Sequence, residues 1–143
     1  MGMYGESAIR AVKLAAVMNI PDPQAAWDQA IRSLTDNALL IKKGCPRTTF
    51  LGLCEEGLVR GIPRGTYTSS ATNKSLAIRA VEVLRNEPSI DNAVALWRRV
   101  TADRGLEDNQ MDVVLSLWKN GDIAGQLPVP VRDETAEPGS VQE

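Results

Sequence analysis

Apolar side chains recur along this chain at the three- and four-residue spacing of an amphipathic helix. The first stripe consists of Ala8, Ala11, Val12 and Ala15. A second helix is predicted after Pro21, because Asp22 can cap it and Pro23 suits its first position. Its expected buried face is Ala26, Trp27, Ala30, Ile31 and Leu34. The pattern therefore predicts a pair of helices, each with one buried face.

The second half of the chain repeats this pattern. The pentapeptide from Ala8 to Val12 recurs residue for residue from Ala77 to Val81, an offset of 69 residues. A tryptophan follows each copy, and Trp97 lies 70 residues after Trp27. Both tryptophans fall on an apolar stripe, so we expect them in the core. The repetition indicates a duplicated helical unit.

A third helix completes each unit. Residues 50–59 match residues 114–123 at an offset of 64, which marks helices at about 46–56 and 109–120. Each of these helices is followed by a glycine, the residue that favours a left-handed C-terminal cap, at Gly57 and Gly121.

These elements predict an all-α fold over residues 1–123. We expect a six-helix bundle built from two similar three-helix units, at about 4–60 and 73–123, with approximate two-fold symmetry between them. Residues 124–143 contain prolines and acids without apolar periodicity, so a disordered tail is expected.

Two segments have no counterpart in the repeat. The first unit carries about six extra residues within 36–44, and a connector rich in Gly, Pro, Ser and Thr spans 60–74. Departures from a repeat are places where selection has added something that the fold does not require. They are therefore the first places to look for function.

Charge points to the same region. The net charge is −2, yet residues 42–79 hold seven basic and two acidic side chains, whereas residues 80–143 hold six basic and twelve acidic ones. A basic middle favours an anionic partner, although charges spread over separate solvated faces would give the same count. Two cysteines without a preceding secretory signal indicate a cytoplasmic protein, and no apolar run approaches the 20 or so residues of a membrane span.

Several classes of chemistry are excluded by composition. The chain has no histidine, which removes Ser-His-Asp and Cys-His catalysis in their usual forms and histidine metal sites. Two cysteines alone make a poor zinc site, and neither a Walker-type nor a dinucleotide glycine pattern is present. We expect no catalytic residue, no metal and no cofactor.

The segment from Lys42 to Arg47 is the strongest candidate for binding. If Pro46 is the first residue of a helix, Cys45 is its N-cap and the cations Lys42, Lys43 and Arg47 surround the positive end of the helix dipole. Such an end binds anions and lowers the pKa of a thiol. The alternative is that Cys45 only caps the helix and is buried. Cys54 lies on a core stripe and is expected to be inert.

Residues 53–60, followed by 64–68, also resemble the end of a recognition helix and a basic wing in winged-helix DNA-binding proteins. In that arrangement Arg60, Arg64 and Lys74 would contact phosphates. The second unit has no basic wing after Gly121.

Residues 43–47, 50–57, 61–63 and 110–115 resemble a family of small bacterial proteins catalogued as a domain of unknown function. The resemblance covers about residues 4–123. It implies a bacterial cytoplasmic protein and no particular activity, cofactor or substrate.

Together these observations predict a non-enzymatic binding or regulatory module that recognises a partner protein or an anionic ligand through the insert and connector. The candidate ligand-binding residues are Lys42, Lys43, Cys45, Arg47, Arg60, Arg64, Tyr67 and Lys74. The alternatives are a nucleic-acid-binding protein that uses residues 42–74 as a winged-helix-like element, and a thiol-dependent enzyme that uses Cys45. No membrane association is expected.

Overall fold

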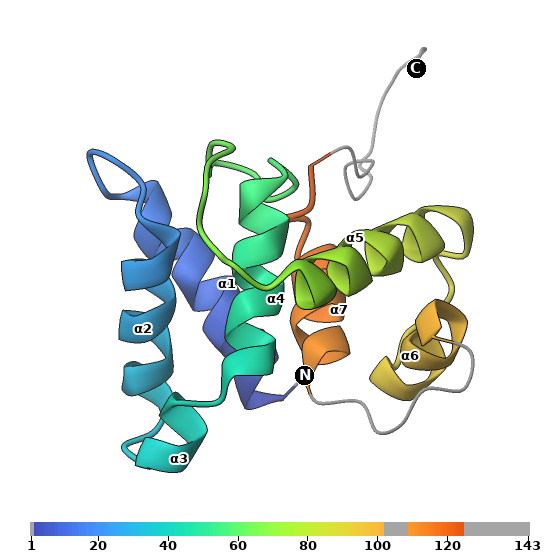
Figure 1. Ribbon diagram of the computed structural model, residues 1–143, viewed down its shortest axis with the longest axis horizontal. Helices are drawn as coiled ribbons and strands as arrows, with labels where there is room; N and C mark the ends of the chain where they lie inside the picture. Colours follow the sequence, from blue (N-terminus) through green and yellow to red (C-terminus); the bar gives the residue numbers. More distant parts are fainter. Residues whose placement is uncertain (1, 102–108, 125–143) are drawn as a thin grey trace.

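The computed structural model describes residues 2–101 and 109–124, and within them the protein is all-α, as predicted (Figure 1). The helices of this part of the chain are α1 (Met3–Ala16), α2 (Pro23–Leu34), α3 (Ala38–Ile41), α4 (Gly44–Glu55), α5 (Ala71–Asn86), α6 (Ala93–Thr101) and α7 (Gln110–Lys119). Six of them correspond to the predicted helices, and the four-residue α3 lies in the insert, where no helix is predicted from sequence. Of the expected disordered tail, Ala124 belongs to the described part and bonds to Leu58, and residues 125–143 lie outside it.

Local sequence explains where these helices begin and end. The Asp22 side chain accepts a hydrogen bond from the backbone N–H of Ala25 at 3.1 Å, and Pro23 is the first residue of α2, as predicted. Gly57 and Gly121 follow α4 and α7 with φ angles of 75° and 78°. Both glycines therefore adopt the left-handed conformation that the sequence predicts.

The first helix of each predicted unit packs against the third helix of the other unit. Besides packing on α2, α1 packs on α7, and besides packing on α6, α5 packs on α4 (Figure 1). The helices α4 and α7 also contact each other. The core is therefore shared by both halves of the chain.

An antiparallel bridge between Val59 and Ile123 joins the segments that follow α4 and α7. The Arg60 N–H donates to the Asp122 carbonyl at 2.8 Å, and the Ala124 N–H donates to the Leu58 carbonyl at 2.7 Å. Arg60 and Ala124 are 64 residues apart, and so are Leu58 and Asp122. The two hydrogen bonds therefore join equivalent positions of the two predicted units. The bonds follow the predicted correspondence, while duplication itself stays an interpretation of the sequence.

The two tryptophans differ in burial. Trp27 is fully buried and its ring centroid lies 5.4 Å from that of Phe50, as expected for a core residue. Trp97 packs against the edge of the core and is only partly buried, whereas the sequence predicts a core residue. Among the described helices, the main packing partners of α6 are α5 and α7, and Trp97 lies at the margin of these contacts.

Two glycines allow helices to approach closely. A Cβ atom at Gly52 would lie 2.8 Å from the Cα atom of Lys74, where α4 crosses α5. A Cβ atom at Gly5 would collide with the hydroxyl of Ser116, where α1 crosses α7. Both crossings between the two halves of the chain therefore depend on a missing side chain.

Candidate functional site

The eight residues predicted to bind a ligand fall into two groups near opposite ends of α4. This helix has 12 residues, which corresponds to a length of about 18 Å. Near its beginning are Lys42, Lys43, Cys45 and Arg47, and near its end are Arg60, Arg64, Tyr67 and Lys74. The eight residues are thus divided between the two ends of α4 and do not form one site.

The predicted position of Cys45 is wrong. Lys43 is the N-cap of α4, so Cys45 is the second helical residue and Pro46 the third. The side chain of Cys45 is half-buried, and its carbonyl accepts a hydrogen bond from the Thr49 hydroxyl at 2.7 Å. Proline is tolerated throughout the first turn of a helix, because the N–H groups there have no intrahelical partner.

The cations near the start of α4 contact other parts of the same molecule. The Arg47 guanidinium donates from Nε and Nη2 to the two carboxylate oxygens of Asp28 in α2, at 2.9 and 3.2 Å. The Lys43 ammonium donates to the Asn109 side chain at 2.6 Å and lies 5.8 Å from the centre of the Tyr4 ring. Lys42 is exposed. The ion pair with Asp28 offsets the charge of Arg47, and the contacts with Asn109 and Tyr4 hold the ammonium of Lys43 against the protein.

At the other end of α4, Glu55 is the centre of an ionic cluster. The Lys74 ammonium lies 2.7 Å from a carboxylate oxygen of Glu55 and 2.9 Å from one of Glu56. Glu55 also accepts the backbone N–H groups of Tyr67 and Thr68, at 2.7 and 3.2 Å. The bond from Lys74, followed by these two backbone bonds, lowers the pKa of Glu55 from 4.5 to about 2. The cluster fastens the connector to α4.

The remaining predicted residues lie along the connector. Arg60 donates from Nε to the Ile123 carbonyl at 3.3 Å, and Arg64 is exposed beside Gly57. The Tyr67 hydroxyl donates to the Pro63 carbonyl at 2.7 Å, and burial raises the pKa of Tyr67. No strand forms within residues 60–70, so the paired strands of a wing are not present there. A role in nucleic-acid binding stays a prediction.

The insert contains a feature that the sequence reasoning missed. The four residues of α3, Ala38–Ile41, are apolar, yet none is buried. Leu39 is 82% exposed and Leu40 is 38% exposed. The signal in the sequence is the apolar run directly before Lys42, in a segment that the second unit lacks.

The insert is nevertheless held in place. The Asn37 side chain accepts the backbone N–H groups of Leu39 and Leu40, at 2.9 and 3.4 Å. The carbonyl of Leu40 accepts the hydroxyl of Tyr4, from α1, at 2.8 Å. A capped turn anchored to a core helix thus presents Leu39 and part of Leu40 to solvent, while Ile41 packs against the core. We call Leu39, Leu40 and Lys42 the insert surface.

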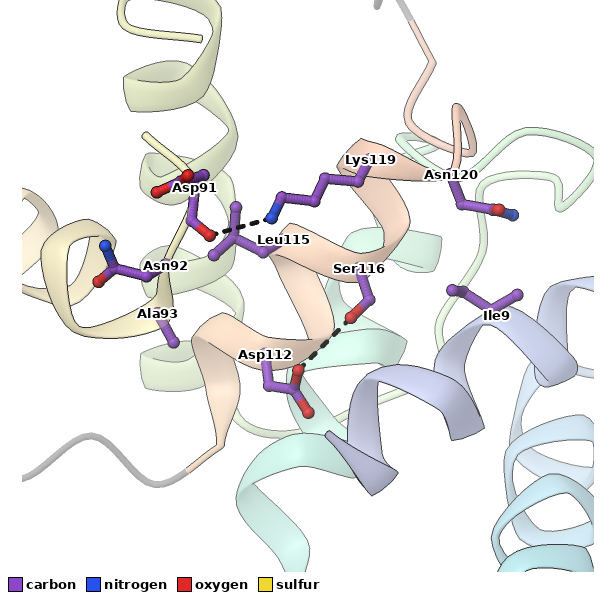
Figure 2. Close-up of a pocket in the computed structure, with 9 residues that line it drawn as sticks. All are labelled: Ile9, Asp91, Asn92, Ala93, Asp112, Leu115, Ser116, Lys119 and Asn120. Atoms are coloured by element: carbon purple, nitrogen blue, oxygen red, sulfur yellow. Dashed lines mark hydrogen bonds between the residues drawn. The ribbon is translucent and has the colours of Figure 1, made fainter. Parts of the chain in front are cut away.

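A second feature is a groove of about 520 Å³ between α1, α7 and the segment that leads into α6 (Figure 2). It is lined by Ile9, Asp91, Asn92, Ala93, Asp112, Leu115, Ser116, Lys119 and Asn120. Sequence reasoning missed it because the lining residues come from three segments that are far apart in the chain. Only the packing of α1 and α6 against α7 brings these segments together.

Hydrogen bonds fix both long sides of the groove. On the α1 side, the Asp112 carboxylate accepts the backbone N–H groups of Gly2 and Gly5 at 3.0 and 2.8 Å, and so caps α1 from another helix. On the opposite side, the Lys119 ammonium donates to the Asp91 carbonyl at 2.9 Å (Figure 2). The groove is therefore an ordered part of the fold.

Comparison with known proteins identifies the family of the chain. The model of a family of unknown function, DUF6979, matches residues 1–124. The chain belongs to this family. No curated protein and no solved structure matches the sequence.

The match to DUF6979 includes every helix of the described part of the chain and supplies no activity for any residue in it. Within residues 2–101 and 109–124 of this DUF6979 member, no group of three or more Cys, Asp and Glu side chains is placed to hold a metal ion. No helix among these residues is both long and apolar enough to cross a membrane.

Proposed function

We propose that this protein is a non-enzymatic binding module that recognises a partner protein through the insert surface. The observation that carries the proposal is that Leu39 and Leu40, neighbours on the fixed turn of α3, are 82% and 38% exposed. An apolar side chain in solvent adds nothing to the stability of the fold. A neighbouring pair of them on a fixed turn is typical of a surface that a partner covers.

Order in the free protein favours binding at this surface. Because Asn37 and Tyr4 already fix the turn, little conformational entropy would be lost when a partner covers it. Complete burial of the Leu39 side chain is worth about 1.5–3 kcal/mol. Lys42 adjoins the two leucines and is exposed, so the best-matched partner segment combines apolar with acidic side chains.

This proposal changes the emphasis of the sequence prediction. Arg47 and Lys74 form ion pairs with acids of the same chain, which favours a contact based on apolar burial over one based on charge alone. We further propose that the protein acts in the bacterial cytoplasm. The free thiols of Cys45 and Cys54 suit a reducing compartment.

A photo-crosslinking amino acid placed at position 39 tests this function. As a matched control, the same amino acid replaces Val94, which is 55% exposed on α6. We expect crosslinking in cells to give a defined protein adduct from position 39 and none from position 94. The captured protein, once purified, should bind the wild-type chain and the Val94→Asp variant but bind the Leu39→Asp variant at least tenfold more weakly. Equal affinity of all three would refute the proposal.

A further inference from the structure

The groove between α1, α6 and α7 has the dimensions of a small-molecule site. Its volume of about 520 Å³ lies within the range of roughly 300–1,000 Å³ that is typical of ligand pockets. None of its lining residues belongs to the insert surface. Any ligand of this groove would therefore be additional to the partner proposed above.

The floor of the groove is largely apolar. Ile9 and Leu115 are 7% and 6% exposed, so their side chains face the groove with only a small surface, and Ala93 closes one side. Figure 2 shows the Leu115 side chain between α7 and the segment that carries Asp91. Such a floor suits the apolar body of a ligand, from which water would be displaced.

One cation stands above this floor. Lys119 extends from α7 across Leu115, and its ammonium meets a neutral carbonyl group, that of Asp91 (Figure 2). The Asp91 carboxylate points away from Lys119 (Figure 2). The Asp112 carboxylate lines the groove, where it accepts the backbone N–H groups of Gly2 and Gly5 and the hydroxyl of Ser116. The charge of Lys119 is thus available at the rim.

From this arrangement we infer that the groove binds a small amphipathic anion, with its apolar part on Ile9, Leu115 and Ala93 and its carboxylate on Lys119. The carboxylate would replace the Asp91 carbonyl as the acceptor of the Lys119 ammonium. A charged acceptor forms a stronger hydrogen bond with an ammonium group than a neutral carbonyl does. Binding would also link α7 to the start of α6 through the ligand.

Titration of the full chain with octanoate, followed by two-dimensional amide NMR, tests this inference. Octanoate combines a carboxylate with an apolar chain. We expect saturable shifts of the amides of Ile9, Ala93 and Leu115, and weaker binding of the neutral analogue 1-octanol. Shifts confined to other regions, or no shifts at millimolar octanoate, would overturn the inference.

Two lysine-to-methionine variants distinguish the effect of a positive charge at the groove from that of a positive charge elsewhere on the surface. Lys119→Met should weaken octanoate binding about tenfold, because it removes a charged hydrogen bond and keeps most of the unbranched side chain. Lys13→Met removes an exposed charge of α1 that does not line the groove, and it should bind like the wild type. Equal affinity of the Lys119 variant and the wild type, with circular dichroism showing both folded, would contradict the assigned role of Lys119.

Discussion

A single carboxylate, Glu55, connects three parts of the chain that sequence alone leaves unrelated. It belongs to α4, it bonds the backbone of the connector at Tyr67 and Thr68, and it pairs with Lys74 of α5. Its low pKa records these contacts, because each donor favours the charged form. The basic connector is thus part of the scaffold at this point.

This environment makes stability depend on pH. Because folding lowers the pKa of Glu55 from 4.5 to about 2, its contribution to the free energy of unfolding is complete above pH 4.5 and is lost as the pH falls towards 2. We expect Glu55→Gln to be less stable than the wild type at pH 7, and the difference to shrink between these pH values. Urea unfolding at a series of pH values measures both effects. A difference that stays constant down to pH 2 would show that the charge of Glu55 does not contribute to the stability of the fold.

The charges at the start of α4 show why sequence reasoning fails at this scale. The sequence shows that Lys43 and Arg47 lie close together along the chain. It does not show their partners, Asn109 and Asp28, which lie on other segments. Side-chain pairs between helices depend on the orientation of the helices, which periodicity does not reveal. Cys45 is misplaced for a simpler reason: proline is accepted at several positions of a first turn, so it does not define the first residue.

Among the elements, the crossing of α4 and α5 has the strictest requirement. A methyl group at Gly52 would meet the Cα atom of Lys74, an atom of the backbone that cannot move without moving α5. We expect Gly52→Ala to destabilise the protein by about 1–3 kcal/mol, even though alanine favours helices over glycine. Thermal unfolding followed by circular dichroism measures the change.

Gly44 provides the matched control. It is the first residue of the same helix, and a Cβ atom there would meet nothing within 4 Å. Gly44→Ala should therefore be neutral or slightly stabilising. If both alanine variants lost the same stability, close approach at Gly52 would not be the cause.

Element positions were largely predictable because the stripes and caps are local signals. The predicted helices agree with α1, α2 and α4–α7, and Asp22, Gly57 and Gly121 mark ends as expected. The exception is α3, whose four residues are too few for periodicity to indicate a helix. Its cap, Asn37, is a residue type that also starts turns, so the sequence does not distinguish the two.

At the scale of the whole molecule, the core is shared, because each half packs one helix against the third helix of the other half. Since α1 packs on α7 and α4 packs on α5, cutting the connector after Arg64 separates helices that need each other. We expect fragments 1–64 and 65–124 to be largely unfolded alone and to regain helix when mixed in equal amounts. Circular dichroism at 222 nm measures this. Cooperative unfolding of either fragment by itself would contradict the shared core.

The repeat predicted two similar units but not the exchange of partners between them. Equivalent apolar faces would allow the first helix of a unit to pack on the third helix of its own unit or of the other unit. The choice depends on close contacts between helices, such as Gly5 with Ser116 and Gly52 with Lys74. The groove is a product of that choice, because it forms where α1 of one half meets α7 of the other. The candidate site was therefore less predictable than the helices that build it.

The described chain starts and ends at opposite ends of the same helix. The N–H of Gly2 bonds to Asp112 in the first turn of α7. Ala124 lies beyond the last turn of α7, where its N–H bonds to the carbonyl of Leu58. The ten residues of α7 span about 15 Å and five further residues lead to Ala124, so a linker of about ten residues is long enough to join the ends. A circular permutant that begins at Gly65 and joins Ala124 to Gly2 would place α7 directly before α1 in sequence. Because every packed helix pair would be kept, we expect this permutant to fold, and its helical circular dichroism spectrum and cooperative thermal unfolding would show that the order of the helices along the chain does not specify the fold.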